Sequence, residues 1–118
     1  MAVSASESPL IPQPQASITL LREAVARIAP VALPTFTRGL SQAADQVRQG
    51  SDLLPLRRFT MQWAVYAHIQ RHPRIAARFR ELEDLAVATD NVEEARSAVA
   101  ELGRILDAAH AAVARETS

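Results

Sequence analysis

The sequence predicts an all-α protein, a compact domain of five helices packed around one central apolar helix. Alanine is the commonest of its 118 residues and aromatic residues make up only 4%, a composition that suits close helix packing better than β-sheets. The stretch 53–71 is apolar on almost every side of a helical wheel. Apolar residues also recur at alternating spacings of three and four over 92–113, which predicts a long amphipathic helix near the C-terminal end.

The central helix is expected between Leu53 and Arg71. This stretch holds the only Trp and the only Tyr of the chain, and a helix that is apolar nearly all round is packed by neighbours on several faces. Asp52 or Ser51 is expected to cap its start. The helix ends at His72, because a residue before proline is pushed out of helical geometry. Its apolar positions are Leu54, Leu56, Phe59, Met61, Trp63, Val65, Tyr66, Ala67 and Ile69.

Two regions precede the central helix. Residues 1–16 contain three prolines among Ser and Gln, a composition that builds no helix and has little to bury, so we expect a disordered arm ahead of a single domain over 17–118. Ser17 or Thr19 caps a first helix that Pro30 ends. Pro34 opens a second helix, and Gly50 is expected to end it as a left-handed cap.

The last two helices are expected to form an antiparallel hairpin. Pro73 opens the first of them, and Asp90 or Asn91, each followed three residues later by Glu, caps the second. The second helix is the longer, so its last turns are expected to overhang. The overhang would bind a protein partner or a second copy of the chain, while packing inside the domain fits the pattern equally well. The residues concerned are Leu106, Ala109 and Val113.

Composition excludes several classes of protein. The chain has no Cys, which excludes disulfides, thiolate metal sites and a Cys nucleophile. No apolar run approaches the ~20 residues that span a bilayer, and the first residues lack the features of a signal peptide, so we expect a cytoplasmic protein. The sequence contains no phosphate loop, nucleophile elbow or catalytic carboxylate pair, and we expect neither an enzyme nor a cofactor.

Charge is distributed unevenly, although 13 basic residues, all Arg, balance 13 acids. Residues 51–80 carry six Arg against one acid, whereas residues 81–118 carry three Arg against nine acids. The guanidinium group suits phosphate and carboxylate recognition. A surface for an anion or an acidic partner is therefore a candidate site, and a nucleic-acid-binding regulator is the first alternative function. Solvated or internally paired arginines are the plainer interpretation. The candidate residues are Arg57, Arg58, Arg71 and Arg74.

His68 and His72 are four residues apart, a spacing that helical metal sites use. No third ligand is evident and His72 lies at the expected helix break, so we interpret both as surface or capping histidines and expect no metal site. The second alternative function is a small-ligand-binding protein with a pocket near Trp63, Tyr66 and His68, although no polar constellation converges there in the sequence.

Part of the chain resembles a family of small helical proteins that is common in actinobacteria and has no assigned function. The matching features span about residues 33–83, and they are Leu33–Pro34, Phe36, the acidic residue before Leu-x-Pro-Leu (Asp52 to Leu56), Phe59, Trp63 and His72–Pro73. Some members look like partners of RelE-like toxins, so the resemblance implies an antitoxin-like role. This chain departs from a typical antitoxin because it lacks an obvious DNA-binding module. We expect a non-enzymatic interaction protein that binds a protein partner through helix faces.

Overall fold

The computed structural model describes residues 8–14, 17–50 and 52–117, and this part of the chain is all-helical as predicted. The elements in chain order are α2 (Ile18–Ile28), the 3-10 turn η1 (Pro30–Ala32), α3 (Leu33–Gln49), α4 (Leu54–Gln70), α5 (Pro73–Ala88) and α6 (Val92–Thr117). No helix in these ranges is both long and apolar enough to cross a membrane.

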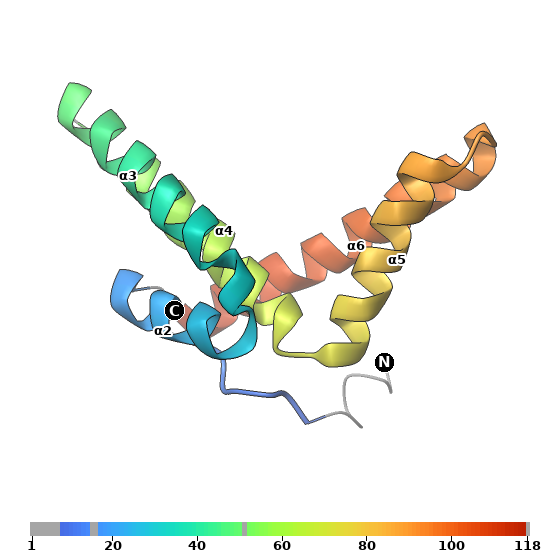
Figure 1. Ribbon diagram of the computed structural model, residues 1–118, viewed down its shortest axis with the longest axis horizontal. Coiled ribbons are helices and arrows are strands. Elements are labelled where there is room, and N and C mark those ends of the chain that lie inside the picture. Colours follow the sequence, from blue (N-terminus) through green and yellow to red (C-terminus); the bar gives the residue numbers. More distant parts are fainter. Residues whose placement is uncertain (1–7, 15–16, 51, 118) are drawn as a thin grey trace.

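The helices form two arms that meet in a V (Figure 1). In one arm α3 packs on α4, and in the other α5 packs on α6, which is the most extensive contact between any two elements. The C-terminal hairpin of helices is therefore present. At the vertex α2 lies against α4, and α6 also reaches α4 there.

The core lies at the vertex, and α4 supplies more of it than any other helix, so the central position predicted for this helix is confirmed. Phe36 of α3 is fully buried. Its ring meets two rings of α4 in T-shaped geometry, Phe59 at 5.0 Å and Trp63 at 5.1 Å between centroids. This arrangement is favoured by the quadrupoles of the rings, and it fastens α3 to α4.

Helix starts have side-chain caps of the predicted kind. Oxygens of Ser17, Asp52 and Asn91 accept hydrogen bonds from backbone N–H groups at the starts of α2, α4 and α6. Asn91 rather than Asp90 is thus the cap of α6. Ser51, the other candidate cap of α4, lies outside the described residues. Each cap satisfies amides that have no partner within the helix.

The end of α3 differs from the prediction. Gly50 has φ −105° and ψ −168°, which is extended backbone and not a left-handed cap. Its N–H donates to the carbonyl of Gln46 at 3.0 Å. The last turn of α3 is closed by this bond, so a positive φ is not needed here.

Residues 8–14 contact the helices, whereas the sequence places them in a disordered arm. Ile11 is buried. The N–H of Leu10 donates to the carbonyl of Arg71 at 2.7 Å, and Nη1 of Arg71 donates to the carbonyl of Ile11 at 3.2 Å. These contacts offset part of the entropy lost when the segment is ordered. The prediction for residues 1–7, 15 and 16 falls outside the described part of the chain.

The apolar residues that recur at spacings of three and four along α6 are buried at one end of the helix and exposed at the other. Ala109 and Val113 are buried in the core, and Leu106 is half-buried. Val92 and Val99, near the turn between α5 and α6, are exposed. The residues that were expected to overhang therefore pack inside the chain, which is one of the two alternatives that the sequence left open. The exposed apolar residues lie at the other end of α6, near its turn to α5. The reason is that α4 lies against the turns of α6 that extend beyond α5.

Candidate functional site

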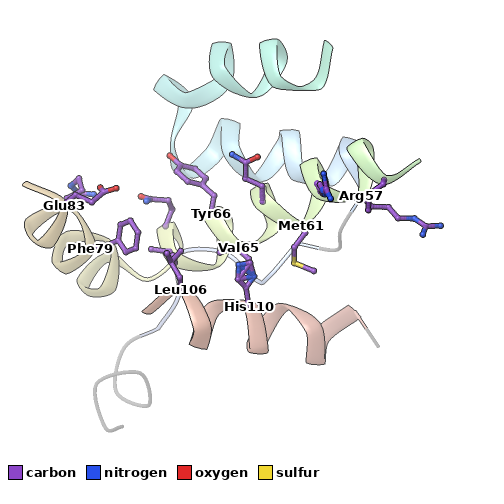
Figure 2. A pocket seen from close by; sticks show the side chains of 14 residues that line it. Arg57, Met61, Val65, Tyr66, Phe79, Glu83, Leu106 and His110 are labelled. Atoms are coloured by element: carbon purple, nitrogen blue, oxygen red, sulfur yellow. The ribbon is translucent and has the colours of Figure 1, made fainter. Parts of the chain in front are cut away.

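An open groove of about 590 Å³ lies between the two arms. Its apolar walls are Leu54, Met61, Val65 and Ile69 from α4, Phe79 from α5 and Leu106 from α6. Figure 2 shows Met61, Val65, Phe79 and Leu106 turned toward the same space from three helices. We refer to the space bounded by these six residues as the groove.

The α4 wall of the groove is an apolar stripe that Arg58 interrupts between Leu54 and Met61. Leu54, Met61, Val65 and Ile69 follow one another at spacings of seven, four and four, which places them on one side of a helix. Val65 and Ile69 are buried at the vertex, whereas Leu54 is 41% exposed and Met61 is 36% exposed farther along the arm. Burying apolar surface is favourable by about 25 cal/mol per Å². The uncovered half of the stripe therefore favours an apolar occupant.

The rim of the groove is basic. Arg57, Arg58 and Arg80 border it together with a single carboxylate, that of Glu83. In the part of the chain that the structure describes, none of these three arginines forms an ion pair. Figure 2 shows Arg57 and Glu83 at opposite ends of the groove. Free guanidinium groups beside an apolar wall suit an occupant that carries carboxylates beside its own apolar face.

Tyr66 and His110 add polar groups to the groove. Burial raises the pKa of the Tyr66 hydroxyl, and the positive charge of Arg80 opposes this shift. The hydroxyl therefore stays protonated near neutral pH and can donate a hydrogen bond to an occupant.

The four arginines singled out from the sequence do not form one surface. Arg57 and Arg58 lie near the start of α4, about 20 Å along the helix axis from Arg71 at ~1.5 Å per residue. Arg71 is buried, and its guanidinium lies 3.8 Å from the carboxylate of Glu116. Arg74 borders a separate hollow between α5 and α6. Of the four residues, only Arg57 and Arg58 lie together as a candidate anion-binding surface. Arg71 instead donates a hydrogen bond to residues 8–14, and Arg74 lies elsewhere.

His72 is buried rather than on the surface, and it acts as a cap. A carbonyl only accepts, so Nδ1 of His72 carries the proton that it donates to the carbonyl of His68, at 2.9 Å. This bond satisfies one of the last carbonyls of α4. Among residues 8–14, 17–50 and 52–117, no group of three or more potential ligands is arranged to hold a metal ion.

His68 is covered by the segment 8–14. Its Nδ1 donates to Oε1 of Gln13 at 3.2 Å, and Nε2 of Gln13 donates to the carbonyl of Ala64 at 3.4 Å. Burial lowers the pKa of His68 to about 4, and the nearby positive charges of Arg71, His72 and Arg115 add to the effect. The imidazole is therefore neutral at pH 7 and serves as a contact between α4 and the segment.

Part of the basic segment is paired within the chain. Arg78 of α5 donates two hydrogen bonds to the carboxylate of Glu101 in α6, at 2.9 and 2.8 Å, and one to Glu81 at 2.7 Å. These bonds raise the pKa of Arg78 and lower that of Glu101. The bidentate pair joins α5 to α6 on the exposed surface of the hairpin, so Arg78 is not a free cation.

The residues expected around a small-ligand pocket do not line a common cavity, although the rings of Trp63 and Tyr66 are in contact, 5.0 Å apart between centroids. Trp63 packs against Phe36 in the core, Tyr66 faces the groove, and His68 lies beneath Gln13. Leu54, Met61, Val65 and Ile69 were predicted only as apolar positions of the central helix, and Phe79 was not singled out as a site residue. The apolar spacing alone does not say which of these positions stay uncovered.

Comparison with known proteins gives no match, since no protein-family model, curated protein or solved structure matches the chain.

Proposed function

We propose that this chain is a non-enzymatic interaction protein whose groove binds an amphipathic helix of a protein partner, with acidic residues beside the apolar face of that helix. The observation that carries the proposal is the exposed Leu54 and Met61, which extend a buried apolar stripe beside Arg57 and Arg58, two arginines that form no ion pair with the described residues. Exposed apolar patches with a polar rim are typical of binding surfaces.

The dimensions of the groove suit a helix. The stripe from Leu54 to Ile69 extends over about 22 Å of α4, at ~1.5 Å per residue, which matches roughly four turns of a partner helix. An amphipathic helix places apolar side chains every three to four residues, so several of them can enter one groove. A small ligand, the second alternative function, would leave most of a stripe of this length uncovered.

The charges on the rim favour one orientation of the partner helix in the groove. Arg57 and Arg58 lie at the start of α4, and Glu83 lies at the opposite end of the groove. A partner helix is therefore expected to place its carboxylates at the end of the groove with the two arginines. Complementary charges of this kind affect orientation and association rate more than the final affinity.

The test uses two labelled helical peptides that share the same apolar face and differ in their flanking residues, Glu in one and Lys in the other. In fluorescence anisotropy the acidic peptide is expected to bind at least tenfold more tightly than the basic one. Met61→Glu is expected to abolish binding, because it places a charge in the apolar wall. Arg57→Glu with Arg58→Glu is expected to reverse the preference between the peptides.

Val31→Glu is the matched control, since Val31 is an exposed apolar residue of η1 outside the groove. This variant is expected to bind the acidic peptide like the wild type. Equal affinity for both peptides, or undiminished binding by Met61→Glu, would refute the proposal.

The antitoxin-like role implied by the family resemblance is one form of this function, and it stays a prediction. It requires the product of the neighbouring gene to form a stoichiometric complex with the chain. Co-expression followed by size exclusion with light scattering tests it. A complex that Met61→Glu prevents would support this form, and separate elution of the two proteins would contradict it.

A further inference from the structure

The arm formed by α5 and α6 ends in a surface whose charge is opposite to that of the groove rim. We call residues 84–100 the arm tip. Val87, Val92 and Val99 of the arm tip are 87%, 61% and 57% exposed. The arm tip contains four acids and one arginine, a net charge of −3. The charged residues are Asp84, Asp90, Glu93, Glu94 and Arg96.

The arm tip has the features expected of an occupant of the groove. Val92, Ala95 and Val99 follow one another at spacings of three and four, so they lie on one face of α6, and they line a shallow hollow together with Asp90 and Arg96. This face is an apolar stripe within a segment whose net charge is −3. The groove offers the complement, an apolar wall bordered by three arginines and one glutamate.

We infer that a second copy of this chain occupies the groove, with the arm tip of one subunit docked between the arms of the other. The inference rests on the proposed helix-binding function of the groove, and it makes the chain itself a competitor of the partner helix. The net charge of −3 on the arm tip meets a net charge of +2 on the groove rim.

Two molecules can make this contact reciprocally, with the arm tip of each in the groove of the other. From Leu106 in the groove to Val92 at the arm tip, α6 extends over about 21 Å at ~1.5 Å per residue, close to the length of the α4 stripe. Each molecule is a V (Figure 1), with the groove between its arms and the acidic arm tip at the end of one arm. Two such molecules related by a twofold axis exchange arm tips, so both grooves are filled and the assembly is closed.

A charge-swap experiment on the full chain tests the inference. Variant G carries Arg57→Glu and Arg58→Glu in the groove rim, and variant T carries Asp84→Arg and Asp90→Arg in the arm tip. In the described part of the chain Asp84 and Asp90 make no ion pair or side-chain hydrogen bond, so variant T keeps the fold. Masses are measured by sedimentation equilibrium from about 1 to 200 µM, and circular dichroism checks that each variant is helical.

The wild type is expected to be a dimer in the upper part of this range. Variants G and T alone place like charges together and are expected to dissociate at least tenfold more readily. A 1:1 mixture of the two is expected to form a heterodimer, because both of its contacts again join opposite charges. The acidic peptide is expected to dissociate the wild-type dimer.

Two results would overturn the inference. One is a wild type that stays monomeric up to 200 µM while the acidic peptide still binds, which leaves the proposed function intact. The other is a dimer whose stability neither variant changes. Failure of the proposed function is distinguishable, because the peptide would then not bind even to monomeric variant T, whose groove is unaltered.

Discussion

Lowering the pH is expected to destabilise the fold through His68. Its imidazole is held neutral between α4 and residues 8–14, where it donates to Gln13. Burial and the charges of Arg71, His72 and Arg115 lower its pKa in the folded state from 6.5 to about 4. The unfolded chain therefore takes up a proton at a higher pH than the folded chain does.

The sign and size of the effect follow from this difference. Stability that depends on neutral His68 is fully present above pH 6.5 and is lost as the pH falls toward 4, because protons then favour the unfolded state. The interval between 6.5 and about 4 corresponds to at most about 3.4 kcal/mol, at about 1.36 kcal/mol per pH unit. His68 is only half-buried, so solvent screening reduces the expected loss to about 1–2 kcal/mol.

Urea denaturation of the wild type and His68→Gln at pH 7.5 and pH 4.5 measures this loss. The free energy of unfolding of the wild type is expected to fall by about 1–2 kcal/mol more than that of His68→Gln, because Gln cannot take up the proton. His110→Gln, at an exposed histidine of α6, is the control and is expected to behave like the wild type. Equal losses in the wild type and His68→Gln would refute the reasoning.

Two further predictions concern stability, and urea denaturation measures both. Phe36→Ala is expected to lower the free energy of unfolding by about 3–5 kcal/mol, since the ring is fully buried between Phe59 and Trp63; a loss below about 1.5 kcal/mol would contradict the role of this cluster. Gly103→Ala is expected to raise it by about 0.5–1 kcal/mol, because a Cβ there meets nothing within 4 Å. Gly39→Ala is the matched comparison and is expected to gain less, because its Cβ would lie 3.2 Å from the ring of Phe59.

The helices of this protein were predictable because their signals are local. Pro30, Pro73 and the caps at Ser17 and Asn91 act within one turn of the chain, and they set helix boundaries whatever the tertiary arrangement. The central position of α4 was predictable for a related reason. A helix that is apolar nearly all round has few stable positions outside a core.

Tertiary contacts account for what the sequence did not reveal. Ile11 lies among prolines in a segment with no periodicity, yet it is buried where its carbonyl accepts a hydrogen bond from the side chain of Arg71, a residue 60 positions later. Arginine side chains usually lie on the surface, yet Arg71 is buried where it makes this hydrogen bond. Gly50 shows the limit of residue preferences, since glycine permits a left-handed backbone without requiring one.

The groove follows from the unequal lengths of the last two helices. α5 has 16 residues and α6 has 26, so α6 continues beyond the hairpin and packs on α4 with Ala109 and Val113. One continuous helix thereby belongs to both arms. The first half of α6 packs on α5 and its second half packs on α4. The helices α4 and α5 therefore diverge from the vertex instead of packing against each other along their full length (Figure 1).

This divergence leaves the stripe on α4 covered at Val65 and Ile69 and uncovered at Leu54 and Met61. Polar residues at Leu54 and Met61 would cost the monomer less stability than at Val65 and Ile69, since part of each side chain is already exposed to solvent. Other apolar residues of the described chain are also exposed, Val31 and Val87 among them, but Leu54 and Met61 differ in lying beside Arg57 and Arg58 along one groove. An apolar wall with charged neighbours is expected where a surface is shaped by what it binds.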